Sequence, residues 1–167
     1  CVVGQYHFLI VRMIVEQGGL PDDLSPYLPV PFYYHYGFHI TAALFTAISG
    51  LQIGQVMLVL GQALNACISL SVYALGKALW KDWRPATVAA LLVSFATRMP
   101  AYYLSWGRYT LTTGLVLLPP AMGMAVIVLR KPRRIVDIAT LALLTAGVLL
   151  SHYFAGVLLA LFIILLA

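Results

Sequence analysis

The feature that most constrains the fold is a long apolar run from Ile53 to Leu79, which carries one charged residue, Lys77. As a helix rising about 1.5 Å per residue, this run is long enough to cross a hydrocarbon core about 30 Å thick. The whole chain is similar in character, with 62% hydrophobic residues, 9% charged residues and a mean hydropathy of +0.95. A soluble domain of 167 residues needs more polar surface than this. The sequence therefore predicts an all-α membrane protein.

Three further apolar segments extend this prediction to a polytopic transmembrane helical bundle. Residues 85–103 and residues 109–129 are each expected to form one span. Residues 135–167 are expected to form either one overlong helix or two short helices bent at Ser151 and His152. Together with residues 53–79, these segments predict about four to five spans.

The N-terminal part of the chain is predicted to lie outside the hydrocarbon core. Residues 1–16 are apolar but interrupted by polar side chains, which is typical of an interfacial helix. Residues 17–31 contain prolines and glycines and predict an extended loop. Residues 37–49 would reach only about 20 Å as a helix, which is too short to cross. We therefore divide the chain into an external region with interfacial helices, residues 1–52, and a transmembrane helical region, residues 53–167.

The basic residues indicate the orientation of these spans. Ten Lys and Arg against five Asp and Glu give a net charge of +5. In a membrane protein such a surplus marks cytoplasmic loops, so we expect the lipid bilayer, and no nucleic acid, as the partner. The basic clusters at residues 77–84 and 130–134 are separated by two spans and are both expected in the cytoplasm. Residues 17–31, 98–108 and 151–153 are then expected on the outer face.

The two ends of the chain predict a larger protein. The sequence starts at Cys1 without an initiator Met, and it stops inside the apolar run "LALFIILLA". We expect the chain to continue in both directions. Its two cysteines, Cys1 and Cys67, are too few for a disulfide framework.

Asp22 and Asp23 are the candidate catalytic residues, because they are adjacent carboxylates on the predicted outer loop. A carboxylate held at the bilayer surface can act as a general base for an acceptor hydroxyl, or it can bind a divalent metal ion as a cofactor. The alternative is structural: "PDDLS" is also typical of a turn that caps a short helix.

The segment "PFYYHYGFHI" supplies two candidate ligand-binding histidines, His35 and His39. Their spacing of four residues would place both imidazoles on one helix face, where they could ligate a metal ion. However, Gly37 and the preceding aromatic residues argue against a continuous helix there. Aromatic anchoring at the membrane interface is the alternative interpretation.

Arg98, Arg108 and His152 complete the set of polar residues near the predicted outer face. An arginine at the end of a span either extends its side chain toward the interface or binds an anion, such as the phosphate of a lipid. His152 interrupts the last apolar stretch and is either a binding residue or a hydrogen-bonding partner between helices. The amides of Gln55, Gln62 and Asn65 are expected to hydrogen-bond to neighbouring helices.

Several motifs together resemble a known family. The stretches "YYHYGFHITAALFTAISGL", "YALGKALW", "SWGRYTLTTGLVLLPPAM" and "LLTAGVLLSHYFAGVLLA" are similar to the N-terminal half of integral-membrane glycosyltransferases of the GT-C fold. The similarity is to the prokaryotic branch related to enzymes that use polyprenyl-phosphate sugars. It covers most of the chain, but each motif is loose.

The resemblance implies inverting sugar transfer from a polyprenyl-phosphate donor on the outer face of a prokaryotic cytoplasmic (inner) membrane. It places His7 and Tyr109 among the substrate-binding residues, together with the histidines and arginines named above. One departure is that the family usually has an acidic residue shortly before a Tyr-His pair, whereas the residues before Tyr6 and His7 include none. Two alternatives stay open: a non-catalytic structural subunit packed against other membrane subunits, and a lipid or solute transporter.

Overall fold

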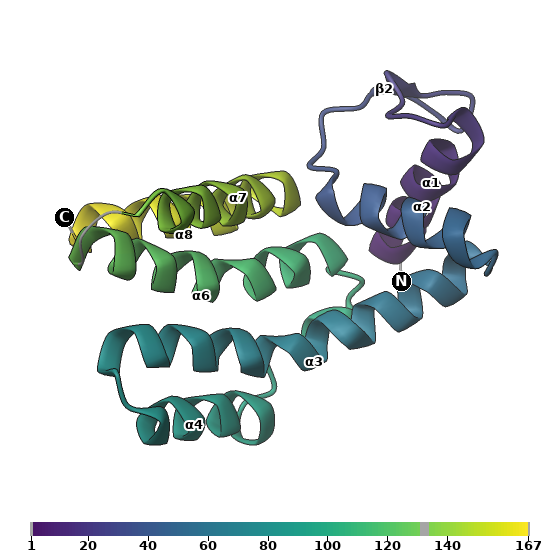
Figure 1. The fold of residues 1–167 in the computed structure, drawn as a ribbon. Coiled ribbons are helices and arrows are strands. Elements are labelled where there is room, and N and C mark those ends of the chain that lie inside the picture. Colours follow the sequence, from purple (N-terminus) through teal and green to yellow (C-terminus); the bar gives the residue numbers. More distant parts are fainter. Residues whose placement is uncertain (1, 131–133, 167) are drawn as a thin grey trace.

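The structure is a computed structural model, and it describes residues 2–130 and 134–166. Its described part is dominated by helices (Figure 1), as the sequence predicts. Two helices, α3 (Ile53–Trp80) and α6 (Tyr109–Arg130), are long and apolar enough to cross a membrane. The other apolar helices of the described residues are shorter than a full span.

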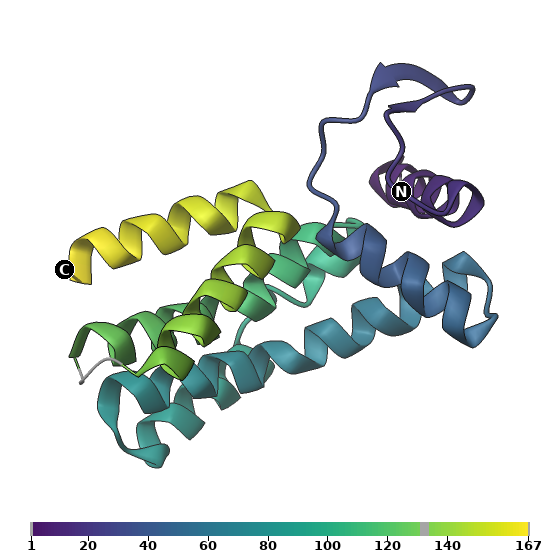
Figure 2. The ribbon, with the colours of Figure 1, turned by 45° about the horizontal axis from the view of Figure 1, so that its top comes forward.

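The N-terminal region forms a small cap on the start of α3. It contains α1 (Val2–Gln17), strand β1 (Asp23–Leu24), strand β2 (Leu28–Pro31) and α2 (Gly37–Ser49). The predicted loop therefore includes a short antiparallel hairpin, in which Leu24 pairs with Leu28. Figure 2 shows α1 beside α2, with the hairpin above them.

The remaining helices form an elongated bundle (Figure 1). After α3 the chain reverses into α4 (Trp83–Leu91) and the π-helical turn η1 (Leu92–Ala96), followed by the short helix α5 (Tyr102–Ser105) and α6. Then α7 (Ile135–Ser151) returns along α6, and α8 (Tyr153–Leu166) reverses again. The predicted bend at Ser151 and His152 is confirmed, because the helix is interrupted at His152.

One predicted helix is shorter than the sequence indicates. Residues 85–103 were expected to form a single helix, but the helical segment ends at Ala96. Thr97 is extended, with φ −115° and ψ 142°, and Met99 precedes Pro100, a position that disfavours helical backbone. The helical part of this segment is therefore shorter than predicted, and α4 with η1 is a shorter apolar helix.

Local sequence signals explain several helix ends. Gln52 and Gln55 form a reciprocal capping box at the start of α3. The carboxylate of Asp82 accepts a hydrogen bond from the Arg84 N–H at the start of α4. Gly50 ends α2 in the left-handed conformation, with φ 67°. These signals fix where the chain turns.

Two buried apolar clusters hold the described residues together. The first joins α1, β1 and α2 to the start of α3, and consists of Ile10, Val11, Met13, Ile14, Leu24, Phe38, Ala42, Ala43, Val56 and Met57. The second joins α6, α7 and α8, and consists of Leu118, Ala121, Val148, Ala155 and Leu159. The first cluster continues across the predicted boundary at residue 52, so the cap is packed onto the bundle.

Candidate functional site

All four histidines of the chain lie at one end of the bundle, where the cap meets α6, α7 and α8. They come from α1, from the segment before α2, from α2 itself and from the break between α7 and α8. Ring contacts link them through Tyr34. We call this group the histidine cluster: His7, His35, His39, His152 and Tyr34.

The first pair in the cluster is formed by His7 and His39. Nδ1 of His7 lies 2.9 Å from Nε2 of His39, so one imidazole donates a hydrogen bond to the other. Both side chains are buried, with 1% and 0% of their surface exposed. The pair connects α1 to α2 across 32 residues of sequence. A buried polar pair of this kind fixes how the two helices dock.

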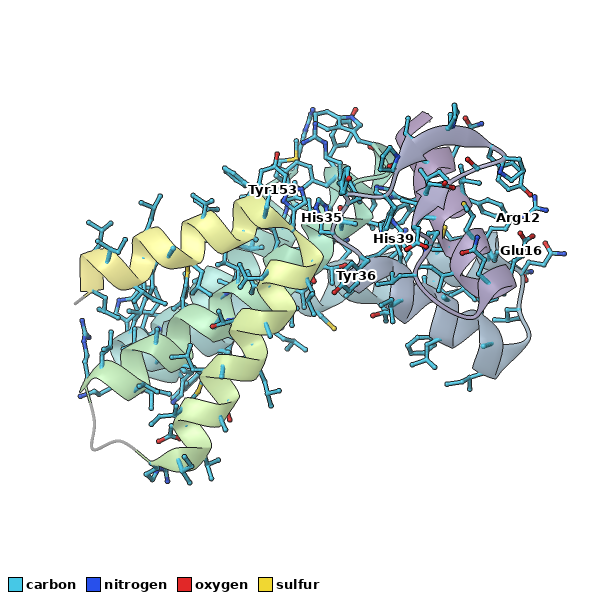
Figure 3. All side chains as sticks on the ribbon, turned by 90° about the horizontal axis from the view of Figure 1, so that it is seen from above. Arg12, Glu16, His35, Tyr36, His39 and Tyr153 are labelled. Carbon is cyan, nitrogen blue, oxygen red and sulfur yellow. The ribbon has the colours of Figure 1, made fainter. Side chains whose placement is uncertain are left out.

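The second pair is formed by His35 and His152, whose ring centroids are 4.5 Å apart. The chain break at His152 lets α8 start beside the segment that precedes α2. Figure 3 shows His35 close to Tyr153, and their ring centroids are 6.0 Å apart. Nδ1 of His152 accepts a hydrogen bond from the Phe154 N–H. The predicted shared helix face of His35 and His39 is not formed, because α2 begins only at Gly37.

Tyr34 connects the two pairs, although nothing in the sequence distinguishes it from the neighbouring tyrosines. Its ring centroid lies 3.9 Å from His35, 5.9 Å from His7 and 5.8 Å from His39. Tyr6 packs edge-on against it at 5.7 Å. The density of aromatic residues in "PFYYHYGFHI" was the available signal. Because this segment is irregular, no helical or strand periodicity shows which of its rings points inward.

Tyr109 and Arg108 bring the start of α6 to the cluster. The Tyr109 ring lies edge-on to His7 at 6.0 Å and stacks on Phe38 at 5.1 Å. The Arg108 guanidinium lies over the ring of Trp106 at 5.3 Å and interacts electrostatically with His152. Gly107, with φ 71°, lets the chain turn from α5 into α6 next to His7.

Burial keeps the imidazoles of His7, His35 and His39 neutral. Desolvation lowers the pKa of His7 to about 4, that of His35 to about 4 and that of His39 to about 3. Neighbouring imidazoles lower these pKa values further, because two positive charges at such short range repel each other. At neutral pH the site therefore offers uncharged donors and acceptors.

Two imidazole nitrogens remain available for a ligand. Nε2 of His35 and Nδ1 of His39 are buried and have no hydrogen-bond partner among the described residues. Backbone of His35 lies near the His39 ring, but without the geometry of a hydrogen bond to Nδ1. An unpaired buried nitrogen is costly, so a bound group that supplied partners would be stabilised there. Within residues 2–130 and 134–166, no three His, Cys, Asp or Glu side chains are grouped to hold a metal ion.

The other predicted site residues lie elsewhere. Asp22 and Asp23 are exposed on the hairpin, where the Asp23 carboxylate accepts a hydrogen bond from the Ser25 N–H. The predicted short helix after this turn is absent, since β1 and β2 occupy the described segment. Arg98 is exposed in the connection between η1 and α5. The structure thus brings together His7, His35, His39, Arg108, Tyr109 and His152, but not Asp22, Asp23 or Arg98.

A hollow of about 450 Å³ opens next to the histidine cluster. Tyr109 and Gly107 form part of its wall, so it reaches residues that also contact His7. The remaining lining is largely apolar and comes from α1, α3 and α5: Gly4, Gln5, Phe8, Gly54, Met57, Leu104 and Ser105.

Comparisons with protein-family models, with curated proteins and with solved structures found no match to this chain.

Proposed function

We propose that this chain is a membrane glycosyltransferase-like protein that binds a polyprenyl-phosphate sugar at the histidine cluster. The observation that supports this proposal most is the convergence of polar aromatic residues and one arginine from separate segments at one end of an apolar bundle. A lipid-linked sugar presents the matching chemistry: a hydrocarbon chain, a phosphate and a hydroxylated head.

Arg108 is the proposed phosphate-binding residue. Its side chain is exposed, and it forms no ion pair with a carboxylate of the described residues. A guanidinium binds phosphate oxygens through two parallel hydrogen bonds. The sugar head would lie against the partly buried imidazoles of His35 and His152, and the unpaired Nε2 of His35 would be offered to one of its hydroxyl groups. His39 is fully enclosed, so it would support His7 and would not contact the sugar. The apolar hollow between α1, α3 and α5 would take the first part of the polyprenyl chain.

The transfer step needs a carboxylate, and the histidine cluster contains none. In the proposed reaction an acceptor hydroxyl attacks the anomeric carbon, its proton passes to Asp22 or Asp23, and the bond from that carbon to the phosphate oxygen breaks. Polyprenyl phosphate leaves with the bonding electrons. Both aspartates are exposed on the hairpin, so the hairpin would have to meet the substrate head outside the cluster. A divalent metal ion held by these aspartates is the alternative role for them.

The proposed location is the cytoplasmic (inner) membrane of a prokaryote, with the histidine cluster facing outward. In this arrangement α3 and α6 cross the membrane, and α4 with η1, α7 and α8 complete a multi-pass bundle of four to five spans. The dense basic residues lie at the opposite end of α3 and α6, which fits a cytoplasmic position. Part of the second basic cluster, residues 131–133, lies outside the described residues.

The proposal is tested with protein reconstituted in liposomes and a radiolabelled polyprenyl-phosphate mannose or glucose. We expect Arg108→Gln to lower donor binding at least tenfold, because one charged hydrogen-bonding group is lost. The control is Arg12→Gln, since Arg12 is already paired with Glu16 on exposed α1 (Figure 3). Equal binding by both variants would exclude the phosphate role of Arg108.

A second assay separates binding from transfer. Asp22→Asn and Asp23→Asn should leave donor binding intact and abolish sugar transfer to an acceptor. If both variants transfer sugar at the wild-type rate, the aspartates have no catalytic role. If the wild-type protein binds donor but transfers nothing, it is a binding subunit.

A structural subunit is the second candidate, and one observation favours it. Gln62 and Asn65 lie within α3, and their side chains form no hydrogen bond among the described residues, contrary to the expectation from the sequence. An unpaired amide inside a bilayer gains from a partner on another helix. Photo-crosslinking from position 65 in native membranes would identify such a helix, whereas labelling of lipid alone would argue against this candidate.

A further inference from the structure

The opposite end of the bundle carries a second, different group of polar residues. Lys77 lies in the last turn of α3, Lys81 follows that helix, and Arg130 lies in the last turn of α6. All three line one hollow of about 240 Å³ between the two helices. We call it the basic hollow. The ends of α3 and α6 that line it lie at the left of the bundle in Figure 1, away from the cap.

The three cations of the basic hollow have no anionic partner in the described residues. Among the described residues, ion pairs join Arg12 to Glu16 and Arg134 to Asp137, and none of these four residues lines the hollow. Asp82, the acidic residue next to Lys81, uses its carboxylate to cap α4 through the Arg84 N–H. Three positive charges that share a small hollow repel one another, so a bound anion would lower the free energy of this end.

The walls of the basic hollow are apolar, and this indicates what kind of anion fits. Ala74 and Ala78 from α3 and Val126 and Ile127 from α6 form the rest of the lining. The alanines leave room between the helices, while the cations lie at the helix ends. Thus a phosphate at the rim and a hydrocarbon chain along the wall would be accommodated together.

Lys81 adds a further observation on the same site. Its φ is 58°, and it is the non-glycine residue with positive φ among the described residues. It ends α3 in the left-handed conformation, with its N–H donating to the Lys77 carbonyl. Glycine is the residue that adopts this conformation without steric cost. A lysine here carries that cost while placing a cation at the hollow.

We propose that the basic hollow is a binding site for the phosphate headgroup of an anionic phospholipid, with one acyl chain lying against α3 and α6. This inference is independent of the proposed sugar transfer and needs only that α3 and α6 cross the membrane. If the basic end faces the cytoplasm, the bound lipid belongs to the inner leaflet, where anionic lipids attract basic side chains.

The test is native mass spectrometry of the delipidated protein titrated with phosphatidylglycerol, with phosphatidylcholine as the zwitterionic reference. We expect one phosphatidylglycerol to bind in preference to phosphatidylcholine. Lys77→Gln, Lys81→Gln and Arg130→Gln should each weaken this binding about fivefold, since one basic residue near an anionic surface contributes about 1 kcal/mol. Arg12→Gln, at an exposed arginine that lies outside the hollow and is paired with Glu16, is the control.

Two further variants separate lipid binding from effects on folding. Lys81→Gly relieves the left-handed backbone, so it should raise the melting temperature while it weakens phosphatidylglycerol binding. Lys77→Arg keeps the charge and should keep the binding. If the three Gln variants match Arg12→Gln in lipid binding and differ only in melting temperature, the cations merely stabilise the helix C-termini, and the proposal is wrong.

Inorganic phosphate distinguishes a lipid from a free anion. We expect phosphate to displace phosphatidylglycerol poorly, and Ile127→Ser to weaken the binding of the lipid but not that of phosphate. If phosphate competes as well as the lipid headgroup does and Ile127→Ser has no effect, the site binds a free anion, which overturns the assignment to a phospholipid.

Discussion

The two ends of the bundle differ in whether their polar side chains are buried and paired or exposed and unpaired. At the cap end, imidazole and phenol rings from separated segments are packed together, and His7 and His39 are fully enclosed. At the basic end, Lys77, Lys81 and Arg130 remain exposed and unpaired within the described residues. A neutral imidazole can be buried once it has a hydrogen-bond partner, whereas a permanent cation cannot. The first end therefore pairs most of its polar groups internally, whereas the cations of the second end are left for an anion from outside.

Removing the histidine pair should have the largest effect on stability. His39→Ala leaves a cavity in the first apolar cluster and deprives His7 Nδ1 of its partner, so we expect a loss of about 2–5 kcal/mol in the free energy of unfolding. Lys77→Ala at the basic end should change it by no more than about 0.5 kcal/mol. Reversible unfolding in detergent micelles measures both values. Equal losses would abolish the contrast between the two ends.

A substitution where α2 approaches α7 should have a smaller effect on stability at the same end. A Cβ added to Gly37 would lie 3.0 Å from the backbone carbon and oxygen of Leu150, which cannot move aside cheaply. Gly37→Ala should therefore cost about 1–3 kcal/mol and loosen the contact between His35 and His152. Gly54→Ala is the matched control, since its Cβ would meet nothing within 4 Å. The same unfolding assay should find Gly54→Ala neutral or stabilising.

Acid should act first on the cap end. The pKa values of His7, His35 and His39 are lowered below the value of 6.5 expected in an unfolded chain. The unfolded state therefore binds protons first as the pH falls, and stability declines by about 1.4 kcal/mol per pH unit for each histidine between pH 6.5 and about 4.

Single-tryptophan variants can localise this effect. Trp106 reports on the cap end, and Trp83 reports on the start of α4 at the basic end. On acidification the fluorescence of Trp106 should change before that of Trp83. Simultaneous changes at both positions would mean that the bundle unfolds as one unit and that the histidines do not act locally.

Most of the secondary structure could be predicted, with one informative exception. The apolar runs of α3 and α6 and the break at His152 follow from composition and helix length. The structure of residues 85–103 does not follow from them, because the apolar character of this segment continues beyond Ala96 but the helix ends there. The restriction that Pro100 places on Met99 was a local signal for this ending, and it outweighed hydropathy.

The candidate site was predictable only as a list of residues. The sequence singled out the four histidines, Arg108 and Tyr109, but it also singled out Asp22, Asp23 and Arg98, which lie apart from them. It gave no way to separate the two groups. Tyr34 was missed because its neighbours Tyr33 and Tyr36 have the same chemistry, and only packing distinguishes them.

The sequence by itself determined that the chain is helical and apolar, where its charges lie along the chain and where the last two helices are separated. These properties depend on residues close together in the sequence, through hydropathy, capping and proline. Only the tertiary structure decided that His7 meets His39, that His35 meets His152 and that Lys77 shares a hollow with Arg130. The physical reason is that such contacts depend on which helices pack side by side, and an apolar helix surface fits many neighbours about equally well.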